Sequence, residues 1–131
     1  PTGELFEYDG SEVKQLKHQP PVMPGVSGSA REAQTSAIYG GDLYVGVWPW
    51  AELWRLDSDT GEWNFVRRMF THPEITDRQT HPYETEATAL GHVLNRWGHR
   101  ITGLVPFNNS LFVSTSAKGS APYEQSFEFL N

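Results

Sequence analysis

Apolar and polar residues alternate with a period of two in several short runs of the chain. Residues 3–9 read GELFEYD and residues 51–57 read AELWRLD. In both runs a small residue, Glu, Leu, an aromatic residue, a charged residue, an apolar residue and Asp follow one another. A third, weaker copy reads QSFEF over residues 125–129. A period of two is typical of strands with one buried face, so each run predicts a β-strand.

A second pattern also recurs, and it predicts hairpins. Residues 38–46 read IYGGDLYVG and residues 106–114 read PFNNSLFVS, each an apolar run, a two-residue turn and another apolar run. Gly-Gly and Asn-Asn both tolerate the positive φ angles that a tight hairpin turn needs. Two different patterns that recur along one chain indicate an internal structural repeat.

One complete unit is predicted between residues 35 and 69. Its expected strands run over residues 35–39, 42–48, 52–56 and 63–67. Asp57 begins the turn between the last two strands, where its side chain can cap backbone amides and Gly61 can take a left-handed conformation. Four such strands form one antiparallel meander, the size of a β-propeller blade. The acidic residues on these strands are expected on solvated faces.

This unit resembles a known repeat family. The Gly-Gly pair, Leu43-Tyr44-Val45, and Trp54-Arg55-Leu56-Asp57 followed by Trp63 resemble a kelch-type repeat. The turn over residues 57–63 is also similar to the Asp-box of sialidase-like propellers, although it is one residue short. A kelch repeat usually carries a Gly pair after its second strand, whereas residues 46–48 read GVW here. The resemblance implies an all-β fold of propeller blades and, for kelch proteins, most often a protein-interaction scaffold.

The remaining sequence predicts incomplete blades, so residues 1–131 are expected to form a single propeller-type segment. Residues 3–16 would supply the outer strands of a preceding blade, residues 35–69 the full blade, and residues 100–129 part of a following one. Such a segment cannot close a ring, and its open ends expose strand edges. We therefore expect other copies or another chain to complete the ring. The chain begins at Pro1, so we expect either that something was removed upstream or that the chain is a piece of a longer protein. A self-contained small β-sandwich or barrel is the alternative.

The segments without regular pattern are expected on one face. Residues 19–34 and the long loop over residues 70–99 are irregular, and loops of that length tend to be functional. In a propeller, these connections emerge on the same face as the Trp48-Pro49-Trp50 corner and residues 115–121. The sequence therefore predicts a ligand-binding surface there.

Composition narrows the classes of ligand. Aromatic content is 13%, which suits strands, and the formal net charge is -6. An acidic chain argues against a nucleic-acid footprint and against binding an anionic membrane by charge. No apolar run approaches the roughly 18 residues that span a bilayer. The absence of cysteine excludes disulfides and thiolate metal sites.

The long loop carries most of the candidate chemistry. It holds four of the five histidines, with arginines and acidic residues. Two His and two Glu could bind zinc, but the spacing of a metal site is missing, so neither a metal nor a cofactor is predicted. The histidines could instead perform acid–base chemistry on a sugar, or simply anchor the loop.

The expected function is recognition of a glycan or small polar ligand on the loop face. Trp48 and Trp50 could stack on a sugar ring, and we expect one of them to be buried and one available. The alternatives are a carbohydrate-active lyase or hydrolase that uses His and Tyr of the long loop, and a protein-interaction scaffold. The candidate ligand-binding residues are Trp48, Trp50, Arg96 and Lys118, and the candidate catalytic residues are His72, His81, Tyr83 and His99.

Overall fold

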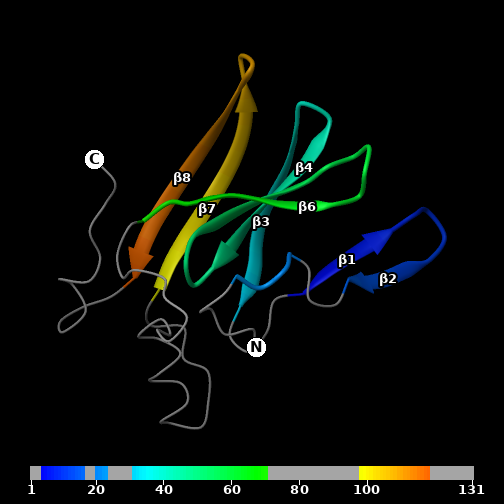
Figure 1. Ribbon diagram of the computed structural model, residues 1–131, viewed down its shortest axis with the longest axis horizontal. Coiled ribbons are helices and arrows are strands. Elements are labelled where there is room, and N and C mark those ends of the chain that lie inside the picture. The colour runs from blue at the N-terminus through cyan, green and yellow to red at the C-terminus, as the bar shows by residue number, and fades with distance from the viewer. Residues whose placement is uncertain (1–3, 17–19, 24–30, 71–97, 119–131) are drawn as a thin grey trace, which may run out of the picture.

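A computed structural model of the chain describes residues 4–16, 20–23, 31–70 and 98–118, and the regular elements in these ranges are all strands (Figure 1). The strands pair as an antiparallel hairpin, an antiparallel four-stranded sheet and a second antiparallel hairpin, in chain order. The fold is therefore all-β with antiparallel sheets, as the alternating pattern predicts, and none of the described sheets is closed. The strands are β1 (Leu5–Tyr8), β2 (Val13–Leu16), β3 (Glu32–Tyr39), β4 (Asp42–Trp48), β5 (Glu52–Leu56), β6 (Trp63–Arg68), β7 (Gly98–Phe107) and β8 (Ser110–Lys118).

The central sheet is the meander predicted from residues 35–69. Its strands lie in the order β3-β4-β5-β6, so every connection is a hairpin. β3 begins at Glu32, earlier than expected, because Glu32 and Ala33 pair with the end of β4 beyond a bulge at Ala33/Thr35. The predicted irregular connection over residues 19–34 therefore ends sooner than its composition suggests.

The hairpins β3–β4 and β7–β8 have the same local geometry. Their turn residues all have positive φ, 62° and 94° at Gly40 and Gly41, 48° and 58° at Asn108 and Asn109. Positive φ at both central positions is the hairpin turn whose twist matches that of the flanking strands. A bulge lies in β7 at Ile101/Gly103, the position that corresponds to Ala33/Thr35 in β3. The repeat predicted from residues 38–46 and 106–114 is therefore a repeat of backbone structure.

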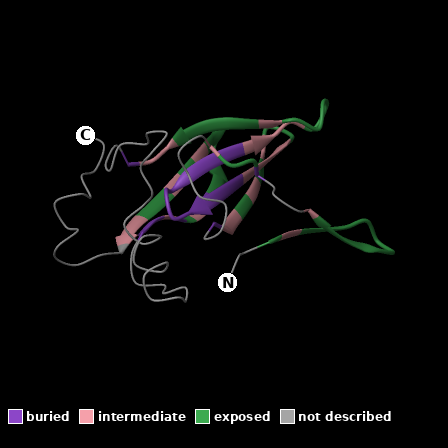
Figure 2. Ribbon diagram, turned by 60° about the horizontal axis from the view of Figure 1, so that its bottom comes forward, coloured by how far each residue is buried: buried purple, intermediate pink, exposed green. Residues whose placement is uncertain are grey.

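The central sheet is covered on both faces, because its strands alternate two sets of apolar side chains. Val45, Val47 and Trp54 form one core cluster, against which Leu5 of β1 packs. Leu53 and its neighbours form the other cluster with Ile101 and Leu104 of β7 and with Phe70. Figure 2 shows the buried residues gathered in the central sheet and β7, with β1–β2 largely exposed.

Glycine permits the close approach of the sheets at one point. A Cβ on Gly46 of β4 would lie 2.7 Å from Cβ of Ile101 in β7. Any side chain at this position would push β7 away from the central sheet, so the GVW sequence that departs from the kelch pattern has a packing role here.

The flanking hairpins lie largely within the ranges predicted for the incomplete blades. β1–β2 falls within residues 3–16, and β7–β8 supplies two of the three strands expected between residues 100 and 129. β7 begins at Gly98, inside the range expected to be loop. The weak third copy at residues 125–129 lies outside the described residues.

Candidate functional site

The Trp48-Pro49-Trp50 corner connects β4 to β5, and both of its indole rings are buried. Trp48 is 1% exposed and Trp50 0%, and the peptide bond between Trp48 and Pro49 is cis. Trp48 lies against the backbone of Gly98, where a Cβ would be 2.3 Å from the indole Nε1. The expectation that one ring is available for a ligand is wrong, because the start of β7 covers this corner.

Several contacts fasten the corner to both flanks of residues 71–97. The backbone N–H of His99 donates to the carbonyl of Pro49 at 2.8 Å, and Trp50 and His99 form a parallel β-bridge. The rings of Phe70 and His99 stack with centroids 4.0 Å apart and 17° between their planes. The described residues on the two sides of 71–97 therefore meet at one place.

A cation lies beside the same corner. The Arg68 guanidinium carbon is 5.0 Å from the centroid of the Trp50 ring, and Met69 donates its backbone N–H to the carbonyl of Ala51 at 3.1 Å. Cation–π contacts at this range are favourable, most of all with Trp. The end of β6 is thus held on the corner immediately before residue 71.

The structure brings some of the predicted site residues together and does not describe others. Trp48, Trp50 and His99 come together at the corner, as the topological argument requires. Lys118 pairs with Gly98 through its backbone, so the end of β8 lies beside the start of β7, although the side chain of Lys118 is not described. His72, His81, Tyr83 and Arg96 lie outside the described residues, and their roles stay predictions.

The side chain of His99 is packed in the interior of the protein. Its side chain is 0% exposed and stacks on the buried Phe70. An imidazole enclosed in this way holds the beginning of β7 against the corner, and its catalytic role stays a prediction.

Sequence reasoning missed a buried ion pair on the other face of the central sheet. Nη2 of Arg31 donates to Oε2 of Glu52 at 2.5 Å, Trp54 Nε1 donates to the same oxygen at 2.7 Å, and Arg31 Nη1 donates to the carbonyl of Pro20 at 2.8 Å. Glu52 is 0% and Arg31 8% exposed. The expectation that acidic residues on strands are solvated is wrong for Glu52. The alternating pattern could have predicted the burial of Glu52, because residues 52 and 54 of one strand lie on the same face and Trp54 is in the core.

The turn that begins with Asp57 confirms the predicted capping role, and the turn that begins with Asp9 is built in a similar way. Oδ1 of Asp57 accepts the N–H groups of Asp59 and Thr60 and the Thr60 hydroxyl, and Gly61 has a φ of 71°. Hydrogen bonds from the Thr60 backbone and hydroxyl hold the pKa of Asp57 below its ordinary value of 3.8. The pKa of Asp9 is lowered in the same way by the amides of Glu12 and Ser11.

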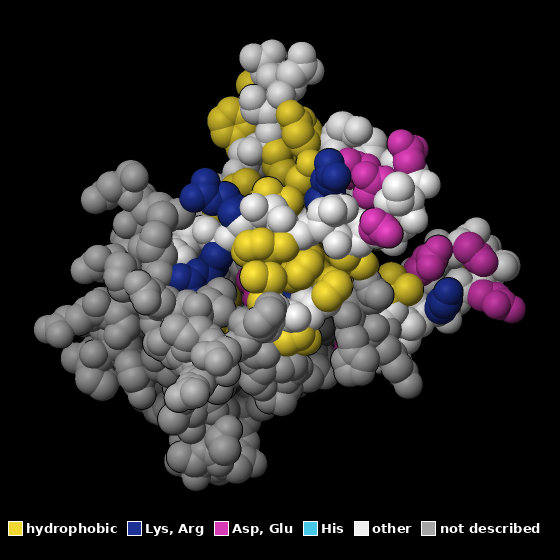
Figure 3. Space-filling model, in the orientation of Figure 1, with side chains coloured by type: hydrophobic (Ala, Val, Ile, Leu, Met, Phe, Trp, Pro, Cys, Tyr) yellow, Lys and Arg dark blue, Asp and Glu magenta, His cyan; other side chains and the backbone are white. Residues whose placement is uncertain are grey.

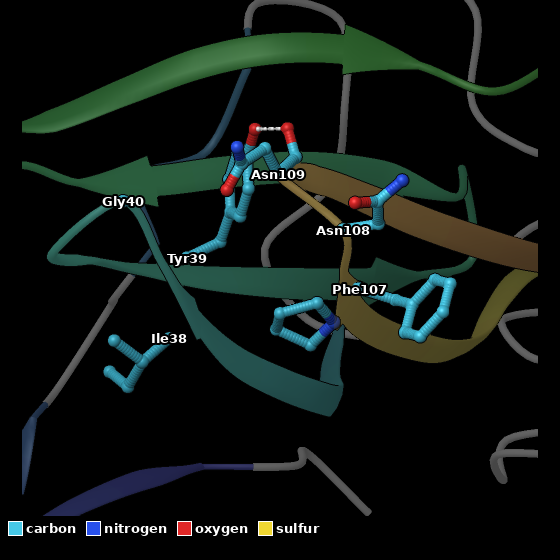
Figure 4. A pocket seen from close by; sticks show the side chains of 7 residues that line it. Ile38, Tyr39, Gly40, Phe107, Asn108 and Asn109 are labelled. Carbon is cyan, nitrogen blue, oxygen red and sulfur yellow. Dashed lines mark hydrogen bonds between the residues drawn. The ribbon is translucent and has the colours of Figure 1, made fainter.

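Two open hollows lie away from the corner. One, of about 470 Å³, lies between the turns of β3–β4 and β7–β8 (Figure 4). There the Tyr39 hydroxyl donates to the carbonyl of Asn109 at 2.7 Å, while Ile38 and Phe107 are exposed at its sides. The second, of about 450 Å³, separates β1–β2 from the central sheet. It is lined by Leu5, Phe6, Glu7, Leu16, Leu43, Leu56, Gly61 and Trp63.

Within the described ranges, no group of three or more potential metal-ligating side chains gathers. The same ranges hold no helix long and apolar enough to pass through a membrane. Comparison of the chain with protein-family models, with curated proteins and with solved structures finds no match.

Proposed function

We propose that the chain is a β-propeller-type recognition module that binds a glycan or small polar ligand through residues 71–97. The observation that carries this proposal is the buried corner, where Phe70 and His99, from the two sides of residues 71–97, stack 4.0 Å apart. A long connection that departs from and returns to a packed scaffold is the usual arrangement of a binding loop.

The arrangement of the sheets supports the blade interpretation. β7 lies mainly against β3 and β4 and touches β5 much less. Neighbouring sheets that are close at their first strands and diverge toward their last strands have the fan-like relation of propeller blades. The two covered faces of the central sheet fit the same interpretation, since a blade packs between two others.

The ligand class rests on the sequence of the proposed binding segment. It contains His72, His81, Tyr83 and Arg96, which can donate hydrogen bonds to hydroxyl or acidic groups. Trp48 and Trp50 are buried, so aromatic stacking on a sugar is not part of the proposal. Instead of contacting the ligand, the corner is proposed to support and position residues 71–97.

A loop replacement tests this proposal. Residues 73–96 would be exchanged for a short Gly-Ser linker, which can close the gap because the flanking residues already meet at the corner. We expect the variant to keep its cooperative unfolding and to lose binding on a glycan array. Retained binding would show that the ligand uses another surface.

Point variants in the full chain separate recognition from catalysis. Arg96→Ala and Tyr83→Phe should each weaken glycan binding about tenfold or more, because each removes a polar contact to the ligand. Reducing-end and unsaturated-product assays on the bound glycans would then reveal a lyase or hydrolase. Turnover that is lost in His72→Ala and His81→Ala would replace recognition with the enzyme as the function.

A further inference from the structure

The hairpins β1–β2 and β7–β8 each correspond to one half of the central sheet. β7–β8 matches β3–β4 in its positive-φ turn and in the position of its bulge. β1 matches β5 in sequence, and the turns that follow them begin alike, because Asp9 and Asp57 accept backbone amides in the same way. In the described structure, β7–β8 therefore lacks an outer pair of strands, and β1–β2 lacks an inner pair.

The two halves also present the same faces as their counterparts. Leu53 of the central sheet packs toward β7–β8, and its counterpart Leu5 packs toward the central sheet. Val45 packs toward the side of β1, and its counterpart Val113 packs toward the central sheet. Each sheet thus stacks on its neighbour with one repeated set of contacts.

The faces at the two ends of this stack expose large apolar side chains. On β7–β8, the outward residues Val105, Phe107 and Phe112 are 58%, 68% and 57% exposed. At the opposite end, Phe6 and Tyr8 of β1 are 60% and 67% exposed. Figure 3 shows the hydrophobic side chains along the projecting end of β7–β8, apart from the acidic turns. Exposed apolar groups of this kind mark an interaction surface.

We infer that the β1–β2 hairpin of a second copy pairs with the edge of β8, so that two chains form one four-stranded sheet in the order β7-β8-β1-β2. Among the described strands β8 pairs with β7 only, and its other edge is where strand addition would place an outer pair.

The central sheet gives the register of this pairing. Tyr44 of β4 pairs with Arg55 of β5. The counterparts of these residues are Phe112 and Glu7, so Phe112 of one copy lies opposite Glu7 of the other. Val113 is one residue further along β8 and points to the other face of the sheet.

A second copy fits this edge because the described β7–β8 hairpin lacks an outer pair of strands, and β1–β2 at the other end of the chain is such a pair. The contact is head-to-tail, so repeated association leads to a closed ring or to an open chain of copies. Each copy brings one complete sheet and two complementary halves, and a closed ring therefore holds an even number of four-stranded sheets. This inference rests on the blade arrangement proposed above and not on the glycan ligand, so the two tests fail independently.

Disulfide trapping tests the pairing, because the chain has no cysteine of its own. The Phe112→Cys and Glu7→Cys variants, both at exposed positions, would be prepared separately and mixed under mild oxidation. Directly opposed residues on paired strands lie within the Cα separation that a disulfide spans. We expect a covalent dimer in the mixture and little in either variant alone.

The matched control changes only the face of β8. A mixture of Val113→Cys and Glu7→Cys should give at least about tenfold less dimer, since the side chain at position 113 points to the opposite face. Equal yields from the two mixtures, or no dimer from Phe112→Cys with Glu7→Cys, would overturn the inference. The absence of a dimer from Phe112→Cys with Glu7→Cys is also the result expected if another part of the chain or an unrelated protein covers the edge of β8.

Sedimentation of the unmodified chain gives an independent measurement. Its mass should exceed 14.8 kDa in multiples as concentration rises. Val105→Lys should weaken this association about tenfold or more, because it places a charge on the outward face of β7. Val66→Lys is the control, since Val66 is also exposed but lies on β6, which packs mainly on β5. A monomer at all concentrations would contradict the inference.

Discussion

Single residues fix the turns of this protein, and Asp57 shows how. Its carboxylate gathers two amides and a hydroxyl, and the backbone N–H of Gly61 donates to its carbonyl at 2.9 Å. A short acidic side chain that satisfies its own turn competes well with water for those donors. The turn is therefore determined by local sequence, and it recurs at Asp9 for the same reason.

Asp57→Asn should make the protein less stable at neutral pH and less sensitive to acid. The folded state holds the pKa of Asp57 below 3.8, so the ionised carboxylate stabilises the fold above that pH, and the contribution is lost as pH falls through the lowered pKa. The urea midpoints of wild type and variant should differ at pH 7 and converge as the pH falls below 3.8 and through the lowered pKa. Asp59→Asn is the control, because Asp59 contributes its N–H to the turn and not its carboxylate. Curves that stay parallel down to pH 2 would contradict the assignment.

The Arg31–Glu52 pair is a residue-scale feature with a larger energetic consequence. Removing one member leaves the other charge buried, which costs about 3–5 kcal/mol, whereas replacing both with apolar residues is often close to neutral. We expect Arg31→Met and Glu52→Leu each to lower the free energy of unfolding by this amount. The double variant should lose much less than the sum. Additive losses in a double-mutant cycle would show that the two side chains do not act as a pair.

At the scale of elements, two kinds of hairpin recur in the sheets. One kind has a turn of two positive-φ residues and a bulge, and the other has an Asp-led turn. Bulges increase local twist and redirect side chains. The bulge at Ala33/Thr35 explains why Ala33 and Ala37 of β3 pack on opposite faces although they are an even number of residues apart.

The hairpin turn of β7–β8 can be stabilised by one substitution. Asn109 has a φ of 58°, which glycine adopts without steric cost. Asn109→Gly should raise the free energy of unfolding by roughly 0.5–1 kcal/mol, and Asn109→Val should lower it by about 1–2 kcal/mol. The bond from the Tyr39 hydroxyl goes to the backbone carbonyl of Asn109, so it is available in all three proteins. Thermal unfolding measures the order, and a more stable valine variant would contradict the turn geometry.

At the scale of the whole molecule, the sheets form an open stack. The central sheet is buried on both faces, while β7–β8 and β1–β2 each expose apolar residues on the outward side. The association proposed above would stabilise the fold, since each contact would remove apolar surface from water.

The melting temperature should therefore depend on protein concentration. If copies associate in the folded state only, mass action raises the midpoint by a few degrees for each tenfold increase in concentration. Val105→Lys should show a much weaker dependence than Val66→Lys. Calorimetry over a hundredfold range of concentration checks this, and a midpoint that is constant for the unmodified chain would speak against association.

The sequence alone determined the strands, their turns and their repetition. Period-two patterns, Gly-Gly and Asn-Asn turns and the Asp-led turns are local properties, because each depends on residues a few positions apart. This is why the four strands of the central sheet and the hairpin at Asn108-Asn109 lie close to where the pattern placed them. The convergence of Trp48, Trp50 and His99 also followed from the order of the strands along the chain.

Only the tertiary structure decided which faces are covered. The indole rings of Trp48 and Trp50 are buried because β7 begins directly on the corner. β7 starts at Gly98, far from the corner along the chain. Glu52 is buried because Arg31 folds over the sheet from another segment and supplies the opposite charge. Burial depends on surfaces brought together from distant positions, and a local pattern shows that a strand has two faces without showing what lies on each.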